Sequence, residues 1–580
     1  MEVCDASISE SPLLGGGEDM VEGMVDYKGR RVIRSKSGGW RSASFIIGVE
    51  MAERFAYYGI ASNLISYLTG PLRQSTATAA ANVNAWSGAA SMFPLLGAFV
   101  ADAYLGRFRT ILFSSLLYVL GLGLLTVSAI LPSPSFPHNQ NTKDHRSCLQ
   151  FQIILFFVSL YLVAIAQGGH KPCVQAFGAD QFDGRNPDEC KSKSSFFNWW
   201  YFGFSGSSFI SLLILNYIQD NFNWVLGFGI PCISMVAALV VFLLGRKTYR
   251  YSSKQDNSNP FLRIAQVFVA AARNWRTTPS TAAVVKEEEA RILLPRHGTY
   301  QFKCRFLDKA LAMVSSDQYG SDENWKMCSI SQVEEAKVVL SLVPIWATCL
   351  IYAVVFAQSS TFFTKQGLTM ERSITPGFEI PPATLQSFIS IAIVVFIPIY
   401  DRIIVPIARA YTGKPSGITM LQRIGTGMFL SLISMVVAAI VEKERLKVAR
   451  DSGLVDMPQV TLPMSVWWLV PQYVLFGVSD VFTMVGLQEF FYDQVPNGLR
   501  SMGLSLYLSI FGIGNFLSSF LISVIEKATS RGGQDSWFAN NLNRAHLDWF
   551  YWLLAGLSVI ELILYLYFAK SYIYNRVSAI

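Results

Sequence analysis

The sequence predicts an all-α membrane protein of twelve transmembrane helices, arranged as six helices, a long central cytoplasmic loop and six more helices. The chain of 580 residues is 52% hydrophobic and only 15% charged, with a mean hydropathy of +0.35. Soluble domains average about 25% charged residues. The apolar residues gather in runs of about 20, which is the length that crosses a bilayer core. Backbone groups in lipid must be satisfied within the segment, so each run is expected to be a helix.

The predicted spans form two groups of six. The first group comprises residues 43–69, 78–103, 110–131, 150–174, 196–217 and 223–245. The second comprises residues 337–364, 382–405, 416–441, 464–490, 501–526 and 548–570. Residues 246–336 between them are polar and basic, with short helical stretches near Phe261–Trp275 and Phe306–Met313. We therefore expect a cytoplasmic N-terminal tail (1–42), an N-terminal bundle (43–245), a cytoplasmic linker (246–336), a C-terminal bundle (337–570) and a cytoplasmic C-terminal tail (571–580).

Positive charges predict which side of the membrane the two termini occupy. An even number of spans places both termini on one side, and Lys and Arg are enriched in cytoplasmic loops. Cytoplasmic termini are supported by Lys28, Arg30, Arg31, Arg34, Lys36, Arg41, Arg107, Arg109, Arg402, Arg409 and Lys414. Lys443, Arg445 and Lys447 depart from this pattern because they follow the ninth span. Residues 1–40 lack the apolar core of a signal peptide, so insertion is expected to rely on the first spanning helix.

Composition argues against several other functional classes. The eight cysteines form no CxxC pair and the five histidines form no HExxH motif, so we expect no metal site, no cofactor and no disulfide framework. No set of nucleophile, base and oxyanion donors lies within the spans, which argues against an enzyme. The net charge of +7 is spread over the ends of the spans and does not indicate nucleic-acid binding. The expected partners are a small solute, protons and the lipid bilayer, with the chain a monomer or weak dimer.

The first span carries charges that need a partner or a water-filled cavity. Glu50, Glu53 and Arg54 are three and four residues apart and share one helix face, which Tyr57 and Tyr58 extend. Each charge at bilayer depth costs roughly 2.5–3.5 kcal/mol on insertion scales. One guanidinium does not satisfy two carboxylates as a simple pair, so one carboxylate is expected to be close to neutral, as a proton carrier requires. The alternative is a buried ion pair that only fixes helix packing.

Two further charged positions lie in opposite halves of the chain. The fourth span carries His170 and Lys171, and the tenth carries Asp480. A Lys171–Asp480 pair would join the two bundles. Protonation of Asp480 would weaken this pair and so shift the balance between two conformations of the protein. The alternative is that each residue only lines water. A lone histidine such as His170 is more often a satisfied interior residue than a pH sensor.

The short loop after the second span contains a possible cytoplasmic gate. Asp102 and Arg107 can hold neighbouring helix ends together, although Arg107 can equally be a simple topology signal. Thr110 follows Arg107 by three residues, a pattern that basophilic kinases accept. Thr110 is therefore a candidate phosphorylation site, with chance occurrence as the alternative.

Several stretches together resemble one known family. They run over roughly residues 25–575 and include Glu50–Gly59, Gly97–Thr110, Gly168–Cys173, Phe196–Tyr201, Arg305–Lys309, Tyr400–Arg402, Gly417–Arg423 and Glu489–Gln494. The sequence resembles the plant nitrate/peptide transporter family, related to proton-coupled oligopeptide transporters. The resemblance implies a major facilitator fold and proton symport, with Glu50, Glu53 and Arg54 handling the proton. It also implies a salt bridge between Lys171 and Asp480, where the family usually has the longer glutamate.

The resemblance leaves the substrate open. Bacterial peptide-transporting relatives have an arginine where this chain has Ala61, and a glutamate on the seventh helix near Val355–Gln358. Nitrate-transporting members can have a histidine where this chain has Phe356. The leading hypothesis is proton-coupled symport of nitrate or another small anion by alternating access. The alternatives are symport of a di- or tripeptide, or of an organic acid such as a phytohormone, and more distantly a membrane receptor without flux. The expected substrate cavity contains Tyr57, Tyr58, His170, Phe356 and Gln358, in either the plasma membrane or the vacuolar membrane.

Overall fold

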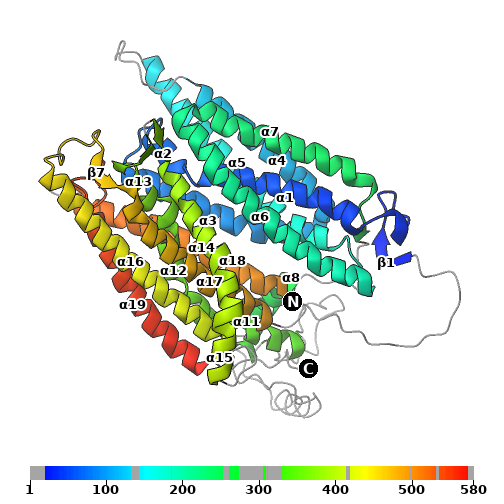
Figure 1. The fold of residues 1–580 in the computed structure, drawn as a ribbon. Helices are drawn as coiled ribbons and strands as arrows, with labels where there is room; N and C mark the ends of the chain where they lie inside the picture. Colours follow the sequence, from blue (N-terminus) through cyan, green and yellow to red (C-terminus); the bar gives the residue numbers. More distant parts are fainter. Residues whose placement is uncertain are drawn as a thin grey trace.

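The protein consists of two helical bundles that lie side by side (Figure 1). The computed structural model describes residues 20–131, 143–183, 186–252, 260–273, 305–308, 310, 328, 330–375, 377–412, 418–495, 500–530 and 535–572. Both ends of the chain and most of the predicted linker therefore lie outside the described residues. Of the two helical stretches expected in the linker, α8 (Pro260–Arg273) and the short α10 (Arg305–Asp308) are described.

Each of the twelve predicted spans contains a described helix. The N-terminal bundle comprises α1 (Gly39–Ala61), α2 (Leu64–Thr69), α3 (Thr76–Val100), α4 (Arg107–Ile130), α5 (Lys143–Ala179), α6 (Pro187–Asn221) and α7 (Trp224–Leu244). The C-terminal bundle comprises α11 (Ile330–Thr348), α12 (Leu350–Phe356), α13 (Phe362–Gly367), α14 (Ser387–Ile399), α15 (Val405–Thr412), α16 (Met420–Asp451), α17 (Val470–Asp493), α18 (Arg500–Thr529) and α19 (Leu547–Ser571). The predicted division into two helical groups therefore matches the order of the helices along the chain.

Most of these helices are long and apolar enough to cross a membrane. Among the described residues, nine helices meet this criterion, and a tenth is added when the two halves of the α11–α13 segment, bent by 45°, are counted as one span. The helices α1 and α6 do not meet it, and α1 carries Glu50, Glu53 and Arg54 near its middle. Both nevertheless run alongside α7 within the N-terminal bundle (Figure 1). Both helices bury polar side chains, such as Arg54 in α1 and Asn216 in α6, which lower their mean hydropathy.

Short strands mark the two ends of the molecule, and none of them was expected from the sequence. At one end, β1 (Met20–Val25) pairs antiparallel with both β2 (Arg31–Ile33) and β3 (Tyr251–Ser252), so the region predicted as an N-terminal tail begins with a hairpin. At the other end, β4 (Met370–Glu371) pairs with β7 (Leu462–Ser465), and β5 (Ser373–Thr375) pairs with β6 (Phe378–Glu379). We refer to these as the β1 end and the β7 end (Figure 1).

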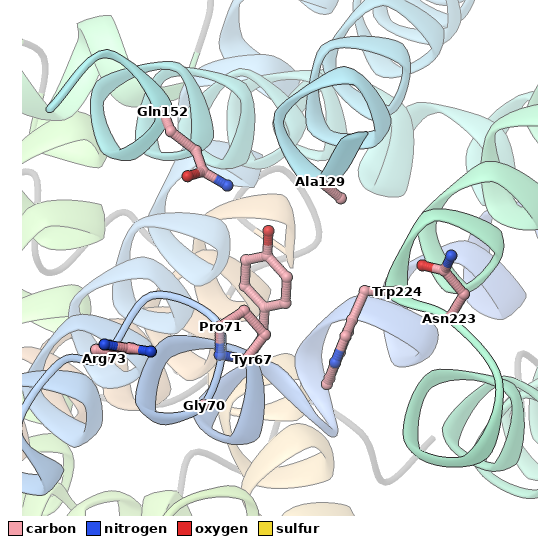
Figure 2. Close-up of a pocket in the computed structure, with 8 residues that line it drawn as sticks. All are labelled: Tyr67, Gly70, Pro71, Arg73, Ala129, Gln152, Asn223 and Trp224. Atoms are coloured by element: carbon pink, nitrogen blue, oxygen red, sulfur yellow. The ribbon is translucent and has the colours of Figure 1, made fainter. Parts of the chain in front are cut away.

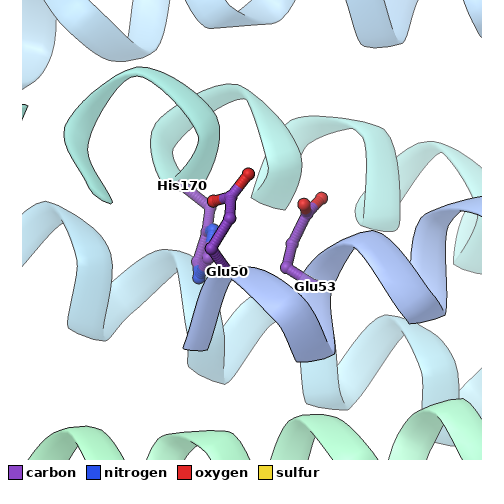
Figure 3. A group of neighbouring side chains, drawn as sticks. All are labelled: Glu50, Glu53 and His170. Atoms are coloured by element: carbon purple, nitrogen blue, oxygen red, sulfur yellow. The ribbon is translucent and has the colours of Figure 1, made fainter. Parts of the chain in front are cut away.

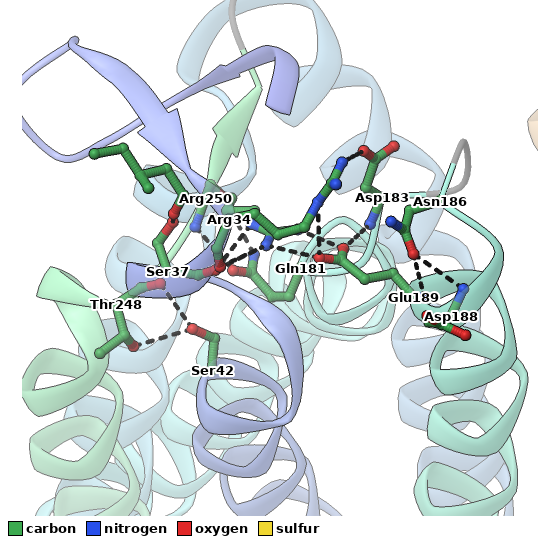
Figure 4. A network of polar contacts seen from close by, with 11 residues as sticks. Arg34, Ser37, Ser42, Gln181, Asp183, Asn186, Asp188, Glu189, Thr248 and Arg250 are labelled. Atoms are coloured by element: carbon green, nitrogen blue, oxygen red, sulfur yellow. Dashed lines mark hydrogen bonds and ion pairs between the residues drawn. The ribbon is translucent and has the colours of Figure 1, made fainter. Parts of the chain in front are cut away.

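A buried polar network fixes the hairpin to the N-terminal bundle at the β1 end (Figure 4). The Arg250 guanidinium is buried, donates to both carboxylate oxygens of Glu189 at 2.7 and 3.1 Å, and donates to the Ser37 carbonyl at 2.8 Å. Arg34 donates to Asp183 at 2.8 Å. Burial by itself would raise the pKa of Glu189, but the hydrogen bonds from Arg250 and from the Asp183 N–H outweigh it and lower that pKa. The segment before α1 is thus held by charge-assisted bonds.

Burial explains Arg445, one of the three basic residues after the ninth predicted span. The helix α16 extends to Asp451, ten residues past the predicted end of the span at 441. Arg445 is fully buried and donates to both oxygens of Glu442 at 2.7 Å, as well as to the Leu542 carbonyl at 2.8 Å. A buried, paired arginine is not a free positive charge, so Arg445 does not count against the predicted orientation.

The two bundles contact each other through hydrogen bonds on the side nearer the β7 end. In the part of the chain that the structure describes, Lys365 donates to Thr69 at 2.9 Å, and Gln386 donates to the Ser62 carbonyl at 2.9 Å. The remaining bonds of this group are Thr384 to the Leu212 carbonyl, the Thr76 N–H to Asn540, and Asn84 to Ser518. Gly88 of α3 also faces Gly512 of α18, where an added Cβ would lie only 3.0 Å from the Gly512 oxygen. This conformation is therefore closed towards the β7 end.

Candidate functional site

The centre of the candidate site is a fully buried charge cluster on α1. The Nε atom of Arg54 lies 2.9 Å from Glu50 Oε1 and 2.8 Å from Glu53 Oε2, and all three side chains are at most 3% exposed. The arginine also lies over the ring of Phe204 from α6, 5.0 Å from its centroid. The helical spacing predicted this shared face. One cation between two carboxylates, in a site closed to water, leaves an excess negative charge that a proton can neutralise.

Side chains from α4 and α5 complete the surroundings of this cluster. The Tyr118 hydroxyl of α4 donates to Glu53 Oε1 at 3.4 Å. His170 of α5 is fully buried, and neither of its ring nitrogens has a hydrogen-bond partner among the described residues. One ligand atom each from His170, Glu50 and Glu53 lies within 4.8 Å of the others (Figure 3). Nitrogen and carboxylate ligands of this kind can hold a divalent metal. Arg54 already supplies positive charge to both carboxylates, however, so the residues present fit a proton better than a metal.

Glycines allow α5 to bring His170 and Lys171 to this point. A Cβ at Gly169 would lie 2.2 Å from Ser114 Oγ of α4, and one at Gly97 of α3 would lie 2.1 Å from the Gly168 carbonyl oxygen. Small residues are the usual means of bringing two membrane helices close together. The Gly168–Gly169 pair that precedes His170 in the sequence therefore has a packing role.

Lys171 and Asp480 are each held within their own bundle. Lys171 is partly buried and within electrostatic range of Glu53 and Glu50. Asp480 of α17 is 4% exposed and accepts a hydrogen bond from the Tyr352 hydroxyl at 2.5 Å. No ion pair joins Lys171 to Asp480 in the described part of this conformation. The predicted salt bridge stays a prediction for a conformation in which the two bundles meet differently.

The aromatic residues expected in the substrate cavity lie near the α1 cluster and on α12. The Tyr57 ring stacks on Trp86 of α3 with centroids 5.7 Å apart, and meets the Tyr58 ring edge-on at 5.5 Å. Phe356 is partly buried and contacts Phe476 of α17 at 5.7 Å between centroids. Tyr57, Tyr58 and Phe356 all keep some exposed surface, as residues that line a cavity require.

Gln358 departs from the expectation of a cavity-lining residue. Its side chain is fully buried and donates to the Val354 carbonyl at 2.7 Å and to Ser518 at 3.2 Å. Ser518 also accepts from Asn84 of the other bundle. Because the chain forms a short 3₁₀ turn at Ala357–Ser360, Gln358 is directed into the contact between the bundles.

The expected gate residues are only partly described. Arg107 donates to Asp180 at the end of α5 at 2.5 Å, while the side chain of Asp102 lies outside the described residues. Thr110 is 4% exposed and its hydroxyl donates to the Gly106 carbonyl at 3.0 Å. A kinase would reach this hydroxyl only after the first turn of α4 opened. Phosphorylation of Thr110 stays a prediction, and in this conformation burial opposes it.

Sequence reasoning missed two residues that contact the site in the C-terminal bundle. Tyr352 bonds to Asp480, and its backbone N–H donates to Glu561 Oε1 of α19 at 2.8 Å. Glu561 is 4% exposed. An acidic residue in the middle of the apolar span 548–570, well away from Asp548 at its start, was a signal that could have pointed to Glu561. Tyr352 had no comparable signal, because tyrosine is common at many positions in membrane helices.

The structure also has a pocket of about 370 Å³ in the N-terminal bundle (Figure 2). It is formed where α2, α4, α5 and α7 begin or end, and it is lined by Tyr67, Gly70, Pro71, Arg73, Ala129, Gln152, Asn223 and Trp224. None of the residues of the charge cluster contributes to it. We therefore do not include this pocket in the candidate site.

Comparison with known proteins identifies the family. The model of the POT family, PTR2, matches residues 108–538, which is most of the chain. The chain belongs to the POT family. Among curated POT relatives from Arabidopsis thaliana, protein NRT1/PTR family 5.10 is 66% identical over 97% of this chain and 98% of the relative. Protein NRT1/PTR family 5.12 is 58% identical over 96% of each chain. The resemblance inferred from the sequence is thereby confirmed, and this POT protein is a multi-pass membrane transporter rather than an enzyme.

Solved structures confirm the fold class. An auto-inhibited POT family peptide transporter superposes with a TM-score of 0.68 at 21% identity, over 93% of this chain and 99% of the other. The POT family transporter PepTSo gives a TM-score of 0.67 at 22% identity, over 92% and 98%. At this identity the likeness establishes the fold alone. The POT family match begins at residue 108, so it does not include the charge cluster on α1.

Proposed function

We propose that this POT family member is a proton-coupled symporter that moves nitrate or another small anion by alternating access. The observation that carries the proposal is the buried cluster in which Glu50 and Glu53 share the single guanidinium of Arg54. A proton on one carboxylate leaves a neutral pair of Arg54 with the other. The cluster can therefore take up and release a proton without losing its ion pair.

The position of the cluster links proton binding to the contact between the bundles. Glu53 and Arg54 lie about two turns before the end of α1, and the next residue after that helix, Ser62, accepts a hydrogen bond from Gln386 of the C-terminal bundle. Thr69 of the following α2 accepts from Lys365. A change of charge on α1 can thus stabilise or weaken the contacts that close the β7 end. Coupling requires that proton binding stabilise one conformation more than the other.

The residues near the site lack the charged partners that the two termini of a peptide would need. Lys171 supplies a positive charge beside Arg54, while Ala61 stands where bacterial peptide-transporting relatives have an arginine, and Val355–Gln358, where they have a glutamate, contains no acidic residue. Phe356 packs against Phe476 and Phe511, so this part of α12 is apolar. A zwitterionic peptide would lose the solvation of its amine there without gaining an acidic partner.

The orientation and the division of the chain follow from the same proposal. We place the β1 end in the cytoplasm, because the basic residues of 28–41 precede α1 on that side. The conformation closed at the β7 end is then an inward-facing one. The domain boundaries predicted above apply, with 43–245 and 337–570 as the two moving bundles. Imaging of a C-terminal fluorescent fusion would decide between the plasma membrane and the vacuolar membrane.

The test is uptake of labelled nitrate into proteoliposomes under an inward proton gradient. We expect uptake that an uncoupler abolishes, that excess dipeptide does not reduce and that Glu53→Gln eliminates. Nitrate uptake unaffected by the uncoupler would contradict proton coupling. Uptake of a dipeptide or an organic acid without uptake of nitrate would show that these compounds, and not nitrate, are the substrates. Binding of nitrate without flux through a folded protein would favour a receptor.

A further inference from the structure

The seventh predicted span is broken near its middle. Its two halves, Gln332–Thr348 and Leu350–Gly367, meet at an angle of 45°. Cys349 stands at the break and makes no side-chain cap to the second half. The first turn of any helix has backbone N–H groups without acceptors in the same helix. In a membrane interior such groups need acceptors from elsewhere in the protein.

Glu561 supplies an acceptor from a different helix. Its Oε1 atom accepts the Tyr352 N–H at 2.8 Å. The side chain of Glu561 lies at the first turn of the second half, where backbone N–H groups have no acceptor within the helix. Glu561 on α19 therefore acts as a cap for the broken span, although it lies more than 200 residues away in the sequence.

Tyr352 connects this cap to the coupling residue Asp480. Its backbone N–H is held by Glu561, and its hydroxyl is held by Asp480 at 2.5 Å. The tyrosine is fully buried, and its ring lies nearly parallel to that of Phe476, 6.2 Å away. Because the ring is rigid, a shift of the Tyr352 backbone also shifts its hydroxyl. Two buried carboxylates are thus joined through one residue at the bend.

We propose that Glu561 is a positioning residue that holds the bend at Cys349 and thereby sets the Tyr352–Asp480 hydrogen bond. When the bend is held, Asp480 is retained by Tyr352. When the bend relaxes, Asp480 is released towards Lys171 of the other bundle. The effect on transport rests on the proposed function, whereas the effect on the bend does not.

The bend can be tested without a substrate by the reactivity of Cys349. This thiol is fully buried and donates to the Ile345 carbonyl at 3.1 Å. The full-length protein in lipid nanodiscs is treated with N-ethylmaleimide, and labelling of the Cys349 peptide is followed by mass spectrometry. We expect Glu561→Leu to raise the labelling rate about tenfold or more, since it removes the acceptor of the buried Tyr352 N–H. Glu561→Gln should stay within about twofold of wild type, because its carbonyl still accepts the N–H.

Two controls make the labelling result specific. Cys173 is buried in the N-terminal bundle, and its rate should not change in any of these variants. Where Glu561→Leu does not give monodisperse protein, Glu561→Ala takes its place in the same comparison with Glu561→Gln. Equal Cys349 labelling in wild type and in the leucine or alanine variant would overturn the proposal. A rise shared by Cys173 would also overturn it, because it would indicate general loosening.

Transport measurements test the link through Tyr352. We expect Glu561→Leu to lower the maximal rate of proton-driven nitrate uptake about tenfold with little change in KM, and Glu561→Gln to restore most of it. Tyr352→Phe removes the bond to Asp480 but keeps the N–H. If Glu561 acts through Tyr352, the double variant is no slower than the worse single variant. If the two substitutions lower the uptake rate independently, so that their factors multiply in the double variant, the link through Tyr352 is refuted. Absence of nitrate uptake by wild type would refute the proposed substrate, while the labelling comparison would still decide the role of Glu561 at the bend.

Discussion

The buried pair on α16 gives a stability prediction that does not depend on any transport assay. Replacing Arg445 by methionine leaves the Glu442 carboxylate in a site that is fully closed to water. We expect Arg445→Met to be strongly destabilising. The double variant Arg445→Met/Glu442→Leu should be much less so, because neither charge then remains.

The magnitude follows from the contacts of the arginine. Removing one partner of a buried ion pair costs about 3–5 kcal/mol. Arg445 also donates to Asn543, the Leu542 carbonyl and Thr369, and losing these bonds costs about 1 kcal/mol each in both variants. The difference between the single and double variants therefore isolates the unpaired carboxylate and should be about 3–5 kcal/mol.

The same helix provides a matched control. Lys447 is 61% exposed and lies 3.7 Å from Glu444, so Lys447→Met should cost no more than about 1 kcal/mol. Unfolding of each purified variant is followed by tryptophan fluorescence as denaturant is added. Equal destabilisation of the single and double arginine variants would refute the reasoning, since it would mean that Glu442 carries no penalty when left alone.

Three further predictions concern coupling and the β1 end. Glu53→Gln should abolish uphill uptake driven by a pH gradient while the protein still reaches the membrane; wild-type accumulation ratios would contradict its role. Lys171→Ala should lose uptake, and recovery of uptake on adding Asp480→Asn would support their pairing in another conformation. The lowered pKa of Glu189 means that its bond to Arg250 stabilises the fold fully above the usual pKa of about 4.5 and progressively less as the pH falls through the lower folded value. The protection factors of the β1 amides, which are exchange rates corrected for the intrinsic pH dependence of amide exchange, should therefore fall at acidic pH in wild type, and Glu189→Gln should show less of this dependence.

The sequence was sufficient to predict features that depend on local spacing. The twelve spans followed from the length of apolar runs, and the shared face of Glu50, Glu53 and Arg54 followed from their three- and four-residue spacing. Both rest on the helical repeat, which neighbouring residues determine. The fold class and the family are confirmed, whereas the roles of the site residues stay predictions.

Features that depend on distant partners could not be predicted in this way. The partner of Tyr352 in α19 and the partner of Arg250 in α6 are set by tertiary packing. The hairpin of β1 and β2 was read as a polar tail because its pairing strand β3 lies after the last helix of the bundle. Gln358 was placed in the cavity from its position in the stretch that the family resemblance compares, and the structure instead has it in a 3₁₀ turn, bonded to Ser518.

The pairing of β1 with β3 has a practical consequence for splitting the chain. The polypeptide enters the N-terminal bundle just after β2 and leaves it just before β3, and the small sheet with Arg250 and Glu189 joins these two points. Residues 20–252 therefore contain all the strands of the sheet that joins the start and the end of the N-terminal bundle. Two fragments that are co-expressed with a cut between β3 and α8 should reassemble into a working transporter. A cut between β2 and α1 would separate strands β1 and β2 from the helices of the N-terminal bundle.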